Sequence, residues 1–145
     1  MIRPFTASDM EAVLHIWLDA SVRAHDFVPA QFWQEQLPAM RTVYLPFAQV
    51  WVYEDAGQVL GFYALVEDQL AAIFVAPQQQ GQGVGAALMQ HAKAQRPQLE
   101  LQVYRDNHAS RAFYRAHGWV DGAESVDEAT GQVQLSMHWR GSHLP

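Results

Sequence analysis

A glycine-rich stretch between two apolar runs is the first candidate for chemistry. In the segment 80–86 (QGQGVGA), Gly81, Gly83 and Gly85 alternate with bulkier residues. If a helix begins here, its first turn carries unpaired N–H groups and a partial positive charge. Glycine lets phosphate oxygens reach those groups without meeting a Cβ atom. The stretch therefore predicts either a backbone cradle for a phosphate or pyrophosphate, or a structural turn capped by glycine.

The same residues also satisfy the dinucleotide-binding pattern G-x-G-x-x-G/A, and Glu100 lies near the distance expected of a ribose-binding carboxylate. The context argues against this interpretation. In a dinucleotide fold the glycines follow the first strand directly, whereas here three or four predicted strands come first and the segment 77–80 intervenes. A Walker loop is excluded, because no Gly-Lys-Ser/Thr ending is present.

A second candidate pair is Asn107 and Tyr114, which are seven residues apart. On a helix this spacing is two turns, or about 10.5 Å, and it places both side chains on one face. A tyrosine phenol, with a pKa of about 10, can donate a proton to a departing thiolate, or its ring can simply pack in the core. Spacing alone does not separate these two roles.

The elements that must position these residues follow from the hydrophobic periodicity. The pattern predicts a strand over 1–5 and then a helix that begins at a capping box of Ser8 and Glu11. Pro38 should kink or split a second helix over 30–44. Further strands are predicted over 49–54, 59–66, 70–76, 99–104, 119–124 and 133–139, with helices from the glycines to residue 93 and over 109–117. This order predicts an α+β fold, an α/β sandwich around a mixed sheet.

Composition narrows the classes of function. The 145 residues carry a net charge of -6 and a single lysine, which argues against a general hold on nucleic acid. Cysteine is absent, so disulfides, thiolate metal sites and a cysteine nucleophile are excluded, and the histidines form no metal motif. No apolar run is long enough to span a bilayer and no signal peptide is visible. We therefore expect a cytoplasmic protein without a metal.

In its glycine stretch and in the segment around Asn107 and Tyr114, the chain resembles the GNAT superfamily of N-acetyltransferases. The run 73–77 (IFVAP) followed by 80–85 (QGQGVG) is similar to the family's motif A, a central strand, a glycine loop and a helix. The segments 103–107 (VYRDN) and 112–119 (AFYRAHGW) are similar to motif B. The region 24–27 (AHDF) with Trp17 resembles a small bacterial subgroup of protein-directed or unassigned acetyltransferases.

The resemblance implies a fold and an activity. It implies that residues 1–145 form one N-acetyltransferase domain, with a mostly antiparallel sheet of roughly six to seven strands and about four helices. It implies transfer of an acetyl group from acetyl-CoA to a primary amine, by direct attack in a ternary complex. The acceptors that fit are a protein lysine or N-terminus and a small-molecule amine. We expect a monomer or homodimer that binds neither nucleic acid nor membranes.

The resemblance also implies roles for individual residues. Backbone groups of Phe74 and Val75 would hold the pantetheine arm and the thioester, Asn107 would bind pantetheine, and Tyr114 would be the catalytic acid. The residues that would hold the pyrophosphate are Gln80, Gly81, Gln82, Gly83, Val84, Gly85 and Ala86. Because glutamines stand in this loop where the family usually has basic residues, we expect modest affinity for the coenzyme.

The chain departs from the family in its general base. Some relatives place a glutamate five residues before the asparagine, and here that residue is Gln102. The predicted strand 70–76 (LAAIFVA) carries no carboxylate either. The attacking amine must lose a proton, so the proton leaves through water or through another group. The candidates are Glu67, Asp68, Glu100 and His25.

Aromatic residues gather before the predicted sheet, at Trp17, Phe27, Phe32, Trp33 and Tyr44. They predict either a core between helices and sheet or an apolar slot for an acceptor, with Asp26 or Glu35 attracting its cation. Two other classes of function stay open on the sequence alone. One is a non-catalytic acyl-CoA-binding module, which the missing glutamate favours, and the other is a dinucleotide-binding oxidoreductase.

Overall fold

One seven-stranded sheet organises the molecule, in the order β1-β2-β3-β4-β5-β7-β6. The computed structural model describes residues 1–141, and the last four residues of the expected domain lie outside this part. The strands are β1 (Ile2–Pro4), β2 (Gln49–Asp55), β3 (Gln58–Val66), β4 (Gln69–Val75), β5 (Gln98–Tyr104), β6 (Val120–Val126) and β7 (Val133–Arg140). Neighbouring strands are antiparallel except β4 and β5, which are parallel. The expected mixed, mostly antiparallel sheet is confirmed.

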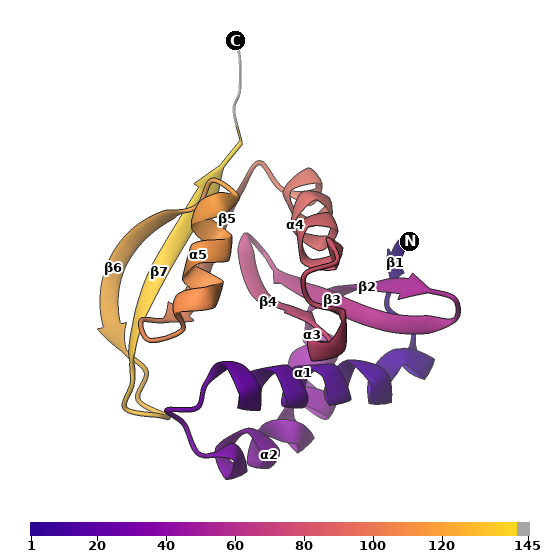
Figure 1. Ribbon diagram of the computed structural model, residues 1–145, viewed down its shortest axis with the longest axis horizontal. Coiled ribbons are helices and arrows are strands. Elements are labelled where there is room, and N and C mark those ends of the chain that lie inside the picture. The colour runs from indigo at the N-terminus through magenta and orange to yellow at the C-terminus, as the bar shows by residue number, and fades with distance from the viewer. Residues whose placement is uncertain (142–145) are drawn as a thin grey trace.

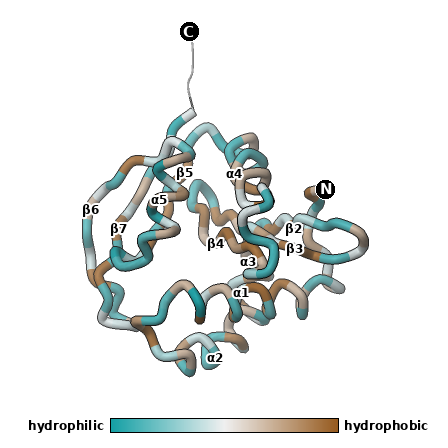
Figure 2. The backbone as a smooth tube through the Cα atoms, viewed as in Figure 1, coloured by the Kyte–Doolittle hydropathy of each residue, from teal (hydrophilic) through white to brown (hydrophobic). Residues whose placement is uncertain are grey.

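Four longer helices cover the two faces of this sheet (Figure 1). α1 (Met10–Ala24) and α2 (Ala30–Ala39) enclose one buried cluster with strands that include β2 and β3, centred on Val13, Val52 and Phe62. α4 (Val84–Gln95) and α5 (His108–Ala116) lie on the other face, where Leu88 and Met137 are fully buried. Figure 2 shows hydrophobic residues along the central strands β3 and β4. Within residues 1–141, no helix has the length and apolar character needed to cross a membrane.

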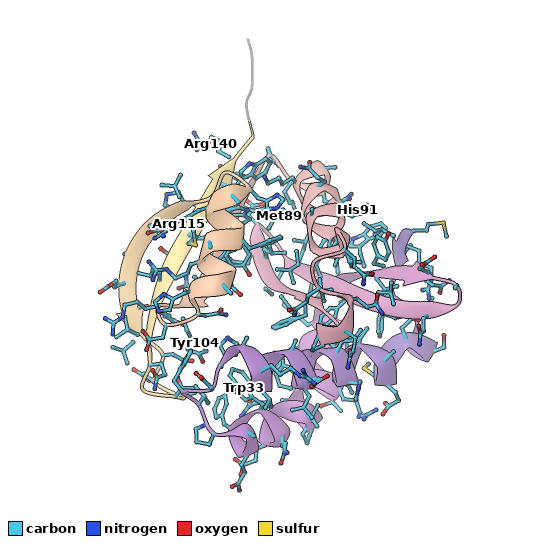
Figure 3. All side chains as sticks on the ribbon, in the orientation of Figure 1. Trp33, Met89, His91, Tyr104, Arg115 and Arg140 are labelled. Carbon is cyan, nitrogen blue, oxygen red and sulfur yellow. The ribbon has the colours of Figure 1, made fainter. Side chains whose placement is uncertain are left out.

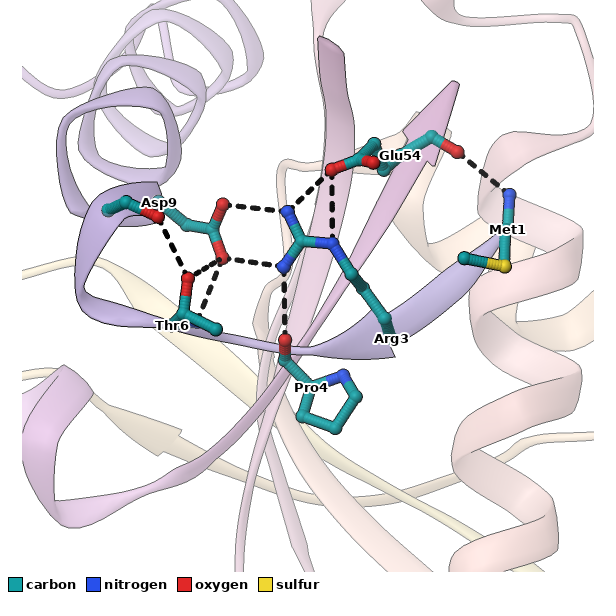
Figure 4. A network of polar contacts seen from close by, with 7 residues as sticks. Met1, Arg3, Pro4, Thr6, Asp9 and Glu54 are labelled. Atoms are coloured by element: carbon teal, nitrogen blue, oxygen red, sulfur yellow. Dashed lines mark hydrogen bonds and ion pairs between the residues drawn. The ribbon is translucent and has the colours of Figure 1, made fainter. Parts of the chain in front are cut away.

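The start of α1 differs from the prediction. The capping box forms at Thr6 and Asp9, around the short 3-10 helix η1 (Ala7–Asp9), and not at Ser8 and Glu11. The Asp9 carboxylate accepts the Thr6 backbone N–H at 2.8 Å and both terminal nitrogens of Arg3 at 2.8 and 2.9 Å (Figure 4). Arg3 lowers the pKa of Asp9 to about 2. The ion pair with Arg3 thus favours Asp9 over Glu11 as the carboxylate of the capping box, with Thr6 in place of Ser8 as its N-cap, and the sequence pattern did not reveal it.

The helical stretch over 30–44 is split after Pro38, as expected. α2 ends at Ala39, and the chain continues as the π-helix η2 (Met40–Tyr44) and the short helix α3 (Leu45–Phe47). The Thr42 hydroxyl donates to the Pro38 carbonyl at 2.8 Å. The wider turn brings the chain back to the sheet at β2.

The two neighbours of β4 differ sharply. β3 and β4 pair from Gly61 opposite Val75 to Val66 opposite Gln69. β4 and β5 pair only where Gln69 lies opposite Glu100, and beyond this point they diverge. The divergence opens the sheet between the C-terminal ends of β4 and β5.

Candidate active site

A groove of about 1180 Å³ occupies the opening between β4 and β5. Its walls come from the end of α1, from β4, from the glycine loop and from β5 with the start of α5. Of the residues predicted for the site, the groove is lined by Phe74, Val75, Gln80, Gly81, Gly83, Gly85, Ala86, Asn107 and Tyr114. Gln82 is exposed outside this lining, and the Val84 side chain is buried in the core. Those two residues could therefore serve a ligand only through their backbone groups.

The glycine loop leads from β4 into the N-terminus of α4. After the 3-10 helix η3 (Pro77–Gln79), Gly81 and Gly83 have φ angles of +80° and +85°, in the left-handed region that favours glycine. Gly83 is the N-cap of α4, and it has no side chain to cap the first-turn N–H groups. These groups and the helix dipole are available to an anion. The loop lacks cationic side chains, so an anion would depend on the backbone.

The exposed edge of β4 offers a second kind of contact. Beyond Gln69 the ladder to β5 ends, so the backbone groups of Val75 that face β5 have no strand partner there. The expected backbone contact of Phe74 with a ligand is corrected, because backbone direction alternates along a strand and the Phe74 carbonyl oxygen faces Gly61 on β3. An extended ligand can add to such an edge as a strand would. The Gln80 side chain closes the end of this edge by donating to the Val75 carbonyl at 3.4 Å.

Asn107 is the N-cap of α5, directly before the helix and not inside it. Its Oδ1 accepts the Ser110 N–H at 3.2 Å, and its Nδ2 lies 3.1 Å from His25 Nε2. The residue is only 7 % exposed, and each end of its amide already has one partner. Each end also keeps one further hydrogen-bonding position, because an amide has two donors and two lone pairs.

Tyr114 lies on α5 and lines the groove, half-buried between the rings of Phe113 and Trp119. Burial raises the pKa of its phenol well above the usual value. The phenol therefore stays protonated near neutral pH and has a proton to donate, while the raised pKa makes it a weaker acid than an exposed tyrosine.

The four candidate bases are not brought to the groove as free groups. Asp68 and Glu100 line a separate hollow of about 400 Å³, together with Gln98 and His138. Glu67 sits at the β3–β4 turn with a φ of +54°. His25 does line the groove, but both of its nitrogens have partners, and burial lowers its pKa. Gln102 lines the groove and cannot accept a proton.

Among the groove residues that sequence reasoning missed are Tyr104, Asp106 and His108. Their position on either side of Asn107 could have drawn attention to them. The aromatic group contains Tyr104 and not the expected Tyr44. Figure 3 shows Tyr104 near Trp33, and their ring centroids are 6.4 Å apart. Tyr44 is 55 % exposed on η2. Trp17 and Trp33 are buried and both line the groove, while Glu35 pairs with Gln31 outside it. The aromatic residues thus serve the core and one end of the groove together.

Comparison with known proteins agrees with this geometry. The family model described as an acetyltransferase (GNAT) domain matches residues 46–121. The chain is 41% identical over 120 residues to the peptidyl-lysine N-acetyltransferase YiaC of Escherichia coli K12, covering 82% of both chains. It is 32% identical to the peptidyl-lysine N-acetyltransferase YjaB of the same strain, over 88% of this chain and 87% of the relative.

Solved structures show the same fold. Apo YjaB from Escherichia coli superimposes with a TM-score of 0.85 at 29% identity, over 98% of each chain. The PaiA N-acetyltransferase of Thermoplasma acidophilum, solved in complex with coenzyme A, has a TM-score of 0.76 at 13% identity, over 94% of this chain and 96% of that one. The chain therefore belongs to the GNAT acetyltransferase family. Its activity is the transfer of an acetyl group from acetyl-CoA to an amine, which corrects the dinucleotide alternative.

Proposed function

We propose that this acetyltransferase modifies lysine side chains of proteins. The observation that carries the proposal is the 41% identity, over most of both chains, to an enzyme named as a peptidyl-lysine N-acetyltransferase. The groove wall carries two exposed carboxylates, Asp26 and Asp106, and one exposed guanidinium, Arg23, which is paired with Asp19 outside the groove. Asp106 lies 3.7 Å from Arg105, so Asp26 is the one of the two carboxylates without an ion pair among the described residues. Such a carboxylate attracts a cationic acceptor and repels an acidic one.

The coenzyme would be held by the residues that the family resemblance assigns. Backbone groups of Val75 would pair with the pantetheine arm, the Phe74 side chain would line the groove beside it, and Asn107 would use its remaining hydrogen-bonding positions. Backbone N–H groups from Gln80 to Ala86 would bind the pyrophosphate, with Gln82 and Val84 contributing only main-chain atoms. Because no cation stands in this loop, we expect modest affinity, and a sub-micromolar dissociation constant for acetyl-CoA would contradict this part.

The residues of the groove divide the chemistry between them. Acetyl-CoA supplies the thioester, and a neutral lysine amine forms the new C–N bond as the C–S bond breaks. The Val75 backbone N–H, on the open side of β4, would stabilise the negative charge on the carbonyl oxygen. Tyr114 would donate its proton to the leaving thiolate, and the nitrogen would release one proton as the amide forms, which returns to Tyr114 through solvent. The proton of the ammonium group would leave through water, since Gln102 cannot accept it.

A peptide assay tests the acceptor. Peptides with a blocked N-terminus and one lysine are incubated with acetyl-CoA, and acetylation is measured by mass spectrometry. A matched peptide with arginine in place of lysine is the control. We expect acetylation of the lysine peptide only. A third peptide with a free N-terminus and no lysine tests the other acceptor, and acetylation of that peptide alone would contradict a lysine acceptor.

Tyr114→Phe tests the acid. We expect turnover to fall at least about tenfold, because general acid catalysis is lost, while acetyl-CoA binding survives. Tyr44→Phe, on the exposed π-helix η2, is the matched control and should behave as wild type. Unchanged turnover in Tyr114→Phe would remove this assignment.

Thermal unfolding with added ligands tests what the glycine loop holds. A ligand at about 100 times its dissociation constant adds roughly 2.7 kcal/mol to the free energy of unfolding. In a domain of this size the melting temperature should rise by several degrees. We expect this rise with acetyl-CoA and with CoA but not with NADH. A rise with NADH alone would contradict the coenzyme site.

A further inference from the structure

Three segments that are far apart in the sequence meet at one end of the groove. They are the end of α1 with His25, the start of α5 with Asn107, and the β6–β7 connection with Asp127. His25 Nδ1 lies 2.9 Å from the Ser21 carbonyl oxygen, and His25 Nε2 lies 3.1 Å from Asn107 Nδ2. We call the pair of His25 and Asn107 the clasp.

The hydrogen bonds of the clasp run in a single direction. The Ser110 backbone N–H can only donate, so it fixes Asn107 Oδ1 as its acceptor and turns Nδ2 toward His25. The Ser21 carbonyl can only accept, so His25 carries its proton on Nδ1 and accepts from Asn107 with Nε2. A neutral imidazole in this one tautomer therefore links the first turn of α5 to the last turn of α1.

The clasp is buried among aromatic rings, which fix the orientation of the imidazole. His25 and Asn107 are each 7 % exposed. The imidazole stacks on Trp33 at a centroid distance of 4.9 Å and meets the edge of Tyr104 at 5.2 Å. The Tyr104 hydroxyl donates to Asp127 at 2.5 Å, which ties the β6–β7 connection to the same point. Breaking the clasp would strand buried polar groups, which is costly.

The location of the clasp suggests what it does. β4 and β5 pair only at Gln69 and Glu100, which close one end of the groove. Asn107 follows β5 at the end where the two strands have diverged, and His25 joins it from α1. We infer that His25 is a positioning residue that holds Asn107, the start of α5 and thereby the width of the groove in the geometry that binds acetyl-CoA. This inference rests on the proposed use of the groove for acetyl-CoA and assigns no chemical step to His25.

Two substitutions of His25 test the inference, because their side-chain amides extend to different ring nitrogens of the imidazole. The amide of His25→Gln extends to the position of Nε2 and can accept from Asn107, whereas the amide of His25→Asn reaches only the position of Nδ1 and can donate to Ser21. Acetyl-CoA affinity is measured by calorimetry, and thermal stability is measured in parallel. We expect His25→Asn to bind about tenfold more weakly, the effect of an unpaired buried donor on Asn107, and His25→Gln to remain close to wild type. His15→Asn, exposed on the same helix, is the control.

The outcomes separate a positioning role from a merely structural one. The inference is supported if His25→Gln binds acetyl-CoA more tightly than His25→Asn while the two variants have equal thermal stability. Two variants that both bind as wild type, or that both weaken equally, overturn it. Nitrogen NMR of the imidazole gives a second readout, with Nδ1 protonated and Nε2 unprotonated expected at neutral pH; the opposite tautomer overturns the clasp.

A third variant keeps the inference falsifiable even where His25→Asn folds poorly. Asn107→Asp keeps an oxygen for the Ser110 N–H but places a carboxylate oxygen against His25 Nε2. The imidazole should then take up a second proton at neutral pH, and an unchanged NMR spectrum of His25 overturns the contact. The lysine-peptide assay separates the two proposals. If acetyl-CoA binds and His25→Asn weakens it but no lysine is acetylated, the acceptor proposal fails and the clasp stands.

Discussion

The two seams beside β4 are built from the same strand and have opposite properties. On one side β3 and β4 are paired along their length, and the glycine at position 61 lets them approach closely. On the other side β4 and β5 share one pair of residues and then separate. In the closed seam, between β3 and β4, the backbone groups are hydrogen-bonded within the sheet. In the open seam, between β4 and β5, the backbone groups beyond Gln69 have no strand partner and can bind a ligand.

The difference shows how one strand can serve both stability and binding. In the closed seam an added Cβ on Gly61 would lie 2.8 Å from the Phe74 carbonyl oxygen and 3.0 Å from Leu88. In the open seam an added Cβ on Gly85 would lie 3.4 Å from Phe113 and 3.5 Å from Val75, in ordinary contact. Packing therefore requires glycine at position 61, whereas beside the open seam it is the left-handed backbone of Gly81 and Gly83 that requires glycine.

Gly61→Ala should produce the largest loss of stability. The added methyl group meets backbone on a buried strand, so β3 or β4 must shift, and overpacking of this kind costs about 1–3 kcal/mol. Urea unfolding measures the change. Gly85→Ala is the matched control, with stability unchanged or higher by up to about 1 kcal/mol, because alanine favours the helix. Equal losses in both variants would contradict the distinction between the seams.

Gly83→Ala should act on binding. Its φ of +85° is strained for a residue with a Cβ, by about 1–2 kcal/mol. The loop can relieve that strain by turning its N–H groups away from the groove, so acetyl-CoA should bind about tenfold more weakly. Gly57→Ala in the β2–β3 turn, with a φ of +78° and open space around it, is the control. It should lose similar stability and keep its affinity; a parallel loss of affinity would contradict a specific role for Gly83.

The smallest expected effect is on pH dependence. Burial lowers the pKa of His25 below that of an unfolded histidine, about 6.5. As pH falls below this value the unfolded chain takes up a proton that the native clasp resists, so stability is lost toward the lower native pKa. The ionisable groups around the clasp are Tyr104 against the imidazole, Asp127 hydrogen-bonded to Tyr104, and four residues of the same groove, Arg23, Asp26, Asp106 and His108.

His25→Gln should remove the part of the stability loss in acid that comes from keeping His25 neutral in the native state. Melting temperatures of wild type and variant, measured between about pH 5 and 8, should diverge only on the acid side. Some sensitivity should remain, because burial also lowers the pKa of His91 and His117. Parallel curves would show that the burial of a neutral His25 contributes nothing to the loss of stability in acid.

Much of the fold could be predicted because its signals are local. The predicted strands 49–54 and 59–66 leave residues 55–58 as the turn between β2 and β3, and its central residues, Ala56 and Gly57, have positive φ as a two-residue turn requires. Pro38 and the glycine loop were likewise readable from residue type. The capping box was misplaced because Asp9 is selected by Arg3, whose side chain reaches it through tertiary packing.

The sequence by itself determined the residue types that the chemistry needs and the elements that carry them: a glycine loop before a helix, an asparagine before the next helix, and a tyrosine two turns on. Only the tertiary structure decided which of those groups meet. His25 is 82 residues from Asn107, so no local pattern links them. The contact shows that His25, a candidate base on the sequence, is instead a hydrogen-bond partner of Asn107, the residue expected to bind the coenzyme. Glu100 likewise lies outside the groove, and no local pattern predicts this. The register and the divergence of β4 and β5 place it, and both are set by packing across the whole sheet.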